Sequence, residues 1–227
     1  MVPHDAHPMD VLRTGVSFPG NIEPEGDFSN QQAVADRLLA CLPSMLLYWH
    51  RFHADGVRID TETDDDSIAG HFLHMLHGKP PKELHRKSLD TTLILYAEHE
   101  FNASTFAARV ITGTLSDMHS AVTGAIGALR GHLHGGANEA AMELISQYES
   151  AEAATAGIHQ KLADKDLIMG FGHRVYTTSD PRNTVNKRMS KALAEDVGNT
   201  TLYPVSEAVE KVMWDEKKLF ANADFFA

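Results

Sequence analysis

The stretch GHLHGGANEAAM, residues 131–142, decides how the rest of the chain is interpreted, because it sets a histidine among residues that let the backbone turn. Its three glycines lack a Cβ and so allow turns and close approach that other residues do not. Asn138 or Glu139 can then start a helix, since a short polar cap and a negative charge both suit a helix N-terminus. The stretch predicts a turn that presents His134 to a ligand, followed by a helix.

Two interpretations of this turn follow from the residues alone. His132 and His134 could ligate a metal together, or one imidazole could be functional beside an unrelated one. Short histidine motifs of this kind also occur without either role. A second histidine stretch elsewhere in the chain bears on the choice.

That second stretch is MGFGHRVYTTSDPRN, residues 169–183, in which a histidine again follows two glycines closely. The GFG segment can bring bare backbone N–H groups up to a ligand, and Arg174 and Arg182 stand near His173 in the sequence. Guanidinium groups form strong, often bidentate hydrogen bonds with carboxylates and phosphates. The stretch therefore predicts a site for an anionic ligand.

Composition excludes several classes of protein. The 227 residues are 43% hydrophobic and hold 31 acidic against 20 basic side chains, a formal charge of −11 that argues against a general nucleic-acid binder. Cys41 is the sole cysteine, so no intramolecular disulfide can form. The sequence shows no secretory signal and no apolar run long enough to span a membrane, and we expect a soluble cytoplasmic protein.

Apolar residues recur at helical spacing along most of the chain, and strand-like alternation is rare. The pattern predicts an all-α fold, with a polar loop at residues 17–30 and a domain boundary near residues 135–137. Pro43 is a possible kink in the longest helix. Helices are predicted within residues 7–17, 31–53, 68–78, 91–98, 102–110, 113–130, 142–165, 186–196 and 206–220.

The remaining histidine groups favour packing over metal binding. His50 and His53 lie one helical turn apart, but no acidic or cysteine partner accompanies them at metal-ligand spacing. His71, His74 and His77 fall three residues apart, whereas a helical zinc site normally uses an i, i+4 pair with a glutamate. We therefore predict no metal site in these segments.

Four motifs in order, LHGGANE, GFGHRVY, DPR and NADFF, resemble those of the citrate synthase family. Within the family, the wording of HPMDVLRTGVS, ETDDDSIAGHFLHMLHG and YAEHEFNAST is most similar to the bacterial 2-methylcitrate synthases. The resemblance runs from about His7 to the last residue. Four ordered motifs make a more specific match than any one of them.

The resemblance implies a citrate-synthase-like, two-domain helical fold. Residues 1–135 would belong to a larger helical domain and residues 136–227 to a smaller one, with the active site in the cleft between them. It also implies a homodimer whose interface lies by residues 113–130. Small residues in that region allow a neighbouring helix to approach closely.

The resemblance also implies a carbon–carbon condensation between an acyl-CoA and oxaloacetate. Asp224, between apolar neighbours in NADFF, would be the base that removes the α-proton, and His134 would donate to the thioester oxygen where charge develops. His173 would donate to the keto oxygen of the second substrate. His99 and Arg182 would hold the oxaloacetate carboxylates.

The implied acyl carrier is coenzyme A, used as a substrate thioester, with no tightly bound cofactor and no metal. Basic side chains would meet its phosphates, and the glycine segment would offer backbone to its adenine or pantetheine arm. The candidate CoA-binding residues are Gly170, Phe171, Gly172, Arg174, Lys187 and Arg188.

The sequence departs from the family pattern in two ways. His132 replaces the usual Gly-Pro wording before the first histidine loop, and the chain ends three residues after Asp224, where relatives continue with further arginines. We therefore expect a fragment lacking both ends, and one that condenses its substrates poorly in isolation. Two alternatives stay open: a citrate synthase using acetyl-CoA, and a non-catalytic helical fragment or histidine-rich metal binder.

Overall fold

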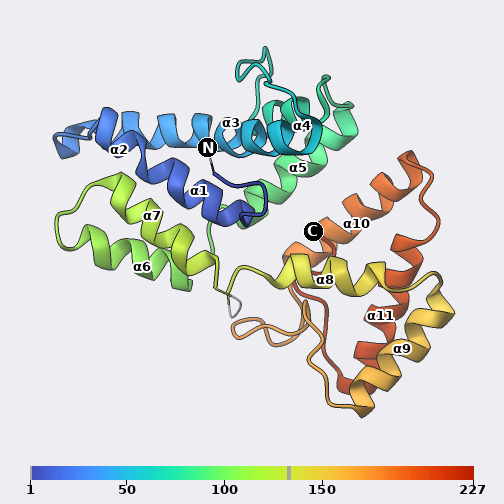
Figure 1. Cartoon of the computed structure of the whole chain (residues 1–227). Helices are drawn as coiled ribbons and strands as arrows, with labels where there is room; N and C mark the ends of the chain where they lie inside the picture. Colours follow the sequence, from blue (N-terminus) through green and yellow to red (C-terminus); the bar gives the residue numbers. More distant parts are fainter. Residues whose placement is uncertain (1, 132–133) are drawn as a thin grey trace. The chain divides into compact units, whose positions relative to one another are not determined.

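The computed structural model describes residues 2–131 and 134–227, and the backbone in these ranges is helical (Figure 1). Within them, the only β pairing is an isolated antiparallel bridge between Phe171 and Ala221. The predicted all-α class is confirmed. The elements are α1 (Pro8–Ser17), α2 (Pro19–Ile22), the 3₁₀-helix η1 (Phe28–Asn30), α3 (Gln31–Asp55), α4 (Ile68–His77), α5 (Glu83–Tyr96), α6 (Ala103–Thr112), α7 (Met118–Leu129), α8 (Ala137–Ser146), α9 (Ala151–Ala163), α10 (Pro181–Asp196) and α11 (Leu202–Lys217).

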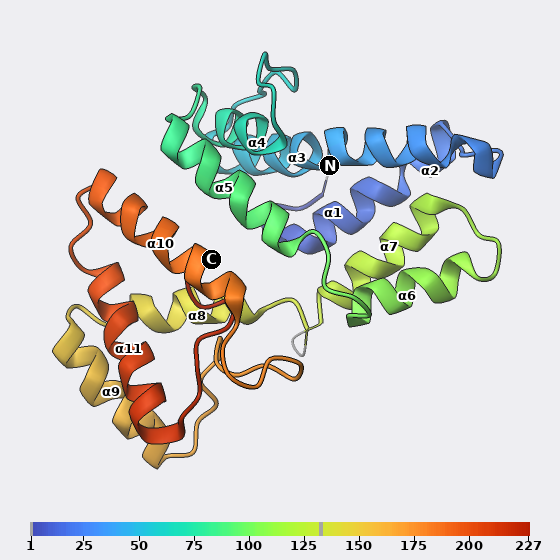
Figure 2. The ribbon, with the colours of Figure 1, turned by 180° about the vertical axis from the view of Figure 1, so that it is seen from behind.

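The chain divides into two compact units, Met1–His134 and Gly135–Ala227. In the first unit, α1, α3 and α7 pack around a small apolar core, α6 lies along α7, and α4 connects α3 to α5 (Figure 2). Val16, Val34, Leu38 and Ile126 form the buried centre of that core. Burying such side chains stabilises the unit by roughly 1.5–3 kcal/mol each.

The pair formed by α6 and α7 depends on one small residue. A Cβ on Gly124 of α7 would lie 2.2 Å from Cδ1 of Ile111 on α6. A Cβ there would force the Ile111 side chain to move, so Gly124 leaves room for that side chain between the two helices. The close approach predicted for residues 113–130 therefore occurs within the chain itself.

In the second unit, α9 packs along α11, and both contact α8 or the segments that connect the helices (Figure 1). Ile158, Val205 and Val209 are completely buried at its centre. Phe225 and Phe226 also belong to this core, so the segment that carries Asp224 is anchored on both its apolar neighbours.

Several predicted boundaries differ from the structure; α5, for example, starts at Glu83 and not at residue 91, and α11 starts at Leu202 and not at residue 206. The predicted loop at residues 17–30 contains α2 and η1, since Pro19 can open a short helix and Asp27 caps η1 by accepting a hydrogen bond from Ser29 N. The predicted helical stretch 142–165 is broken at residues 147–150, where Ser150 caps a new helix. α10 starts five residues before the predicted position, because Asp180 caps it and Pro181 occupies its first position.

The longest helix, α3, continues through Pro43 to Asp55. Its apolar residues face the core and its other face is polar, as expected for a helix at the surface of a unit. Among the helices of the described ranges, none combines the length and apolar character needed to cross a membrane.

Candidate active site

His134 follows α7 in the first unit and is half-buried. Its backbone N–H donates to the carbonyl of Gly131 at 2.9 Å, which closes the predicted turn. The backbone N–H of Ser104 donates to His134 Nε2 at 3.2 Å, and the Ser104 hydroxyl lies 3.1 Å from the same nitrogen. A backbone N–H can only donate, so Nε2 is an acceptor and the proton of the neutral ring is on Nδ1. The His134 ring is thereby held as a donor through Nδ1.

The N-terminus of α6 holds Ser104 in place. Asn102 caps this helix, and its Oδ1 accepts hydrogen bonds from Thr105 N at 2.9 Å and from the Ser104 hydroxyl at 2.7 Å. His99 is half-buried in the segment that joins α5 to α6, three residues before this cap. The predicted residues His99 and His134 thus flank or contact the same helix start.

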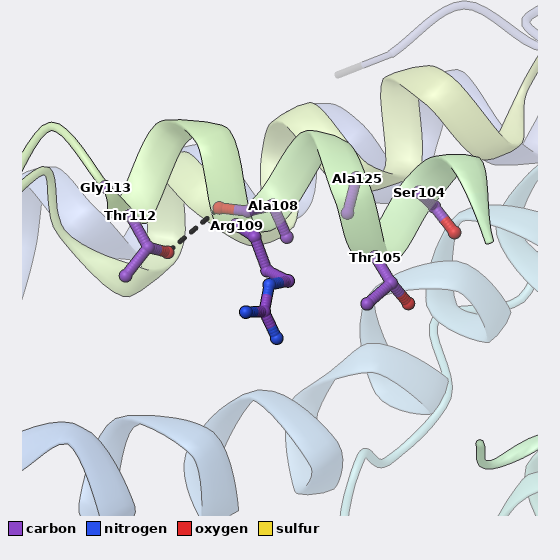
Figure 3. Close-up of a pocket in the computed structure, with 7 residues that line it drawn as sticks. All are labelled: Ser104, Thr105, Ala108, Arg109, Thr112, Gly113 and Ala125. Atoms are coloured by element: carbon purple, nitrogen blue, oxygen red, sulfur yellow. Dashed lines mark hydrogen bonds between the residues drawn. The ribbon is translucent and has the colours of Figure 1, made fainter. Parts of the chain in front are cut away.

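An open cavity of about 570 Å³ runs along α6, with Ser104 and Thr105 at one end and Thr112 and Gly113 at the other (Figure 3). Arg109 is the charged group on its wall, and its guanidinium also stacks 4.6 Å from the ring centroid of Phe101. None of the predicted catalytic residues lines this cavity. It meets the candidate site only through Ser104.

His173, in the second unit, has the opposite arrangement of its ring. Its Nδ1 accepts hydrogen bonds from the backbone N–H groups of Val175 at 3.0 Å and Tyr176 at 3.2 Å. The proton of the neutral ring is therefore on Nε2. The Tyr176 ring lies 4.8 Å from the imidazole, centroid to centroid, and restricts its rotation.

The segment that carries Asp224 is paired with the glycine segment before His173. Gly172 N–H donates to the carbonyl of Phe220 at 2.8 Å, and Asn222 N–H donates to the carbonyl of Gly170 at 2.9 Å. The Asn222 side chain donates to the carbonyl of Gly172 at 3.0 Å and accepts from Asp224 N–H at 3.0 Å. One side-chain amide thus joins the backbone next to His173 to the backbone of Asp224.

This pairing corrects one prediction. The N–H of Gly172 was expected to face a ligand, but it is used by the neighbouring segment. The glycines have another reason to be there: Gly170 and Gly172 have positive φ angles of 87° and 73°, and a Cβ on Gly170 would lie 3.0 Å from Phe225. Phe171 packs on Phe225 with ring centroids 4.5 Å apart. These residues build the loop.

Arg182 is held by a buried carboxylate at the start of α10. Asp180, whose side chain is 0% exposed, forms a bidentate pair with it: Oδ1 accepts from Nε at 3.0 Å and Oδ2 from Nη2 at 2.8 Å. Asp180 Oδ1 also accepts from Arg182 N–H, and Oδ2 accepts from Ala223 N–H, both at 3.0 Å. The pair leaves Nη1 as the part of the guanidinium that can meet a ligand.

Electrostatics agree with this geometry. Burial by itself would raise the pKa of Asp180, but hydrogen bonds from the side chain and backbone of Arg182, and from Ala223, hold it below its ordinary value. Burial likewise opposes the charge on Arg182, yet its pKa is raised by Asp180 first and by Tyr176 and Asp224 to a smaller extent. Asp224 is therefore near enough to act electrostatically on Arg182.

The predicted CoA-binding cations differ in their surroundings. Lys187 is half-buried between Glu210, at 2.5 Å, and Glu207, at 3.5 Å, and these carboxylates would repel a phosphate. Burial would lower the pKa of Lys187, but the two glutamates raise it above its ordinary value. Arg174 and Arg188 are exposed. We therefore remove Lys187 from the proposed CoA site and keep the two arginines.

One hydrogen-bonded frame in the second unit thus includes the backbone beside His173, the backbone of Asp224 and the side chain of Arg182. The residues that make the frame, Asp180 and Asn222, had no role assigned from the sequence, although both stand inside the quoted motifs DPR and NADFF. Ser104 likewise had no role assigned from the sequence. Its backbone contact with His134 spans 30 residues and carries no sequence signal.

The metal-binding alternative gains no support from the described residues. Within residues 2–131 and 134–227, no group of three or more histidine, cysteine or acidic side chains is placed to hold a metal ion. His71 bonds to Thr63 and Ser44, and His74 pairs with Asp65. His132 lies outside the described residues.

Comparison with known proteins gives a family. The protein family described as "Citrate synthase, C-terminal domain" matches residues 1–227 of this chain. The chain is 63% identical over 225 residues to the 2-methylcitrate synthase of Shewanella oneidensis, covering 99% of this chain and 60% of that protein. It is 43% identical over 232 residues to a citrate synthase of Heyndrickxia coagulans, covering 100% of this chain and 62% of that protein.

Among solved structures, the chain is similar to the citrate synthase of the thermophilic archaeon Thermoplasma acidophilum in ternary complex with carboxymethyl coenzyme A and oxaloacetate. The TM-score is 0.88 at 27% sequence identity, with 99% of this chain and 61% of that chain covered. The chain therefore spans about three fifths of the length of the relatives it matches.

Proposed function

Because this chain belongs to the citrate synthase family, we propose that the protein is a 2-methylcitrate synthase, which converts propionyl-CoA, oxaloacetate and water into 2-methylcitrate and CoA. The observation that carries the proposal is the frame in the second unit, whose hydrogen bonds hold the backbone beside His173, the backbone of Asp224 and the guanidinium of Arg182. The 63% identity to a 2-methylcitrate synthase supports propionyl-CoA as the acyl donor.

The first step needs a base and a hydrogen-bond donor. Asp224 takes the α-proton of propionyl-CoA, while His134 donates through Nδ1 to the thioester oxygen where negative charge develops. The Ser104 N–H supports this role, because it occupies Nε2 and so fixes the proton on the other nitrogen. The product of this step is the enolate of the thioester, whose oxygen accepts the hydrogen bond from His134.

The second step joins two carbon atoms. The enolate carbon attacks the keto carbon of oxaloacetate. The keto oxygen, hydrogen-bonded by His173 Nε2–H, then gains one proton and becomes the hydroxyl of the product, which balances the proton taken up by Asp224. Arg182 holds a carboxylate of oxaloacetate through Nη1, and His99 holds it from the first unit. Water then cleaves the thioester, which releases CoA and leaves the third carboxylate of 2-methylcitrate.

This chemistry requires residues of both units. His134 and His99 belong to the first unit, whereas His173, Arg182 and Asp224 belong to the second. We propose that the units are the larger and smaller domains of the family and act on one pair of substrates. The exposed Arg174 and Arg188 are the proposed partners of the CoA phosphates.

We also propose that the protein is a cytoplasmic homodimer. The sequence predicts an interface beside residues 113–130. In that region, however, Gly124 packs against Ile111 of the same chain. Phe106 and Val110 of α6 and Leu115 after it are 62%, 55% and 77% exposed, and this apolar surface supports self-association beside the predicted region. Sedimentation of a Phe106→Glu variant, expected to give monomers, tests it.

Turnover of the full-length protein tests the function. Thiol release is measured with oxaloacetate and either propionyl-CoA or acetyl-CoA, at equal enzyme concentration. We expect a higher kcat/KM with propionyl-CoA, by roughly 10-fold or more, since one methylene changes binding in a pocket by about 1–3 kcal/mol. A preference for acetyl-CoA would make the protein a citrate synthase, and no release with either would refute a condensing enzyme.

A further inference from the structure

We propose that Asp180 is a positioning residue that couples the substrate arginine, Arg182, to the base, Asp224. This inference rests on the proposed function and adds a residue to it. One oxygen of Asp180, Oδ2, accepts from Arg182 Nη2 at 2.8 Å and from Ala223 N–H at 3.0 Å. The guanidinium and the backbone beside the base therefore share one acceptor.

The carboxylate of Asp180 has no capacity left for a substrate. Its two oxygens accept four hydrogen bonds, two each. Three of these come from Arg182 and one comes from Ala223, and the side chain is fully buried. A buried carboxylate is tolerated only when it is paired and hydrogen-bonded in this way. Asp180 therefore acts through the groups it holds and not by touching a reactant.

The backbone that Asp180 holds is clamped from a second side. Asn186, six residues further along α10 and 1% exposed, donates from Nδ2 to the carbonyl of Ala223 at 2.9 Å. The N–H and the carbonyl of Ala223 are thus both bound to α10. This carbonyl is part of the peptide bond between Ala223 and Asp224. The hydrogen bond from α10 therefore fixes the position of the Asp224 backbone.

The two clamps differ in one respect that makes the coupling testable. Asp180 bonds to both Arg182 and Ala223, whereas the side-chain hydrogen bond of Asn186 within the described residues goes to Ala223 and not to Arg182. Loss of Asp180 should therefore affect oxaloacetate binding and the base together. Loss of Asn186 should affect the base and leave oxaloacetate binding unchanged.

The test compares four forms of the full-length protein: the parent, Asp180→Asn, Asn186→Ala and the control Asp215→Asn. Asn caps helices about as well as Asp, so Asp180→Asn keeps the start of α10. In either orientation of the amide, however, its NH₂ group faces N–H donors that an oxygen of Asp180 accepts from in the parent. Asp215 is exposed on α11 and forms a surface salt bridge with Lys211, away from the frame, so its variant controls for the loss of one negative charge.

For Asp180→Asn we expect kcat to fall by about 100-fold, the effect of misplacing a reacting group by about 1 Å. The KM for oxaloacetate should rise about 10-fold, for the loss of one charge-assisted hydrogen bond, while the KM for propionyl-CoA stays within about 2-fold. Asn186→Ala should lower kcat alone, and Asp215→Asn should match the parent. A role in stability only would not separate the two KM values.

Parental constants in Asp180→Asn would overturn the coupling, and so would equal shifts in both variants. A parent without turnover would instead refute the condensing function, so the two failures are distinct. If Asp180→Asn does not fold, hydrogen exchange of residues 220–224 in the parent decides. Saturating oxaloacetate should slow that exchange at least several-fold, because it steadies Arg182 and hence Asp180; unchanged exchange would overturn the coupling.

Discussion

The two units hold their candidate site residues by different means. In the first unit, one residue at a helix start, Ser104, fixes the His134 ring with its backbone N–H. In the second, the side chains of Asp180, Asn186 and Asn222 fix the backbone around Asp224, the proposed base. A neutral donor can be aimed by a single main-chain group, whereas a carboxylate beside a guanidinium needs a network that also satisfies buried charge.

The largest effect should come from the base itself. In the full-length protein, Asp224→Asn should slow exchange of the α-protons of propionyl-CoA by about 1,000-fold or more, because an amide cannot take up the proton as a carboxylate does. Oxaloacetate binding should stay close to the parental value. Proton NMR in D₂O measures the exchange, with Asp215→Asn as the control, and parental exchange would remove Asp224 from the base role.

The opposite tautomers of the two histidines give the next effect. The amide nitrogen of Asn replaces an Nδ1 donor and that of Gln an Nε2 donor, so His134→Asn should retain more activity than His134→Gln. At His173 the order should reverse. Loss of a correctly aimed donor costs about 100- to 1,000-fold in kcat. The four variants are compared by kcat, and the same order at both sites would contradict the assigned proton positions.

The buried pair in the second unit should appear in stability. Asp180→Asn should lower the free energy of unfolding by about 3 kcal/mol at pH 7, as expected when one partner of a buried ion pair is removed. The pKa of folded Asp180 lies below its ordinary value of 3.8, so its contribution is complete above that pH and is lost as the pH falls through the folded-state pKa.

Urea unfolding of the parent and of Asp180→Asn at pH 7 and below pH 4 measures this. The difference between them should shrink at the acidic pH. A difference that stays constant would mean that the charge of Asp180 does not carry the effect.

The smallest effect should come from Ser104→Ala. This variant loses the hydroxyl at 3.1 Å from His134 but keeps the backbone donor at 3.2 Å, so kcat should stay within about threefold of the parent. Asn102→Ala, which removes the cap that orients Ser104, should cost about 1 kcal/mol in stability. A large kcat loss in Ser104→Ala would show that the hydroxyl holds the ring.

Much of the fold could be predicted from the sequence, because helical spacing of apolar residues and caps such as Asn102 and Ser67 are local signals. Errors arose where the local signal was weak, as at residues 147–150. The motifs predict the candidate reactive side chains, but not the groups that hold them in place. Asp180 meets Ala223 across 43 residues and Asn222 meets Gly172 across 50, and no spacing in the sequence encodes such a contact.

That separation has a consequence for folding order. Closing a loop of 50 residues costs entropy before the contact repays it, so the pairing of residues 170–172 with residues 220–222 raises the contact order of the second unit. A nascent chain emerging from the ribosome has released His173 and Arg182 well before Asn222 and Asp224 follow. Helices α9 and α10 can form early, but the base reaches its place only when the last part of the unit docks.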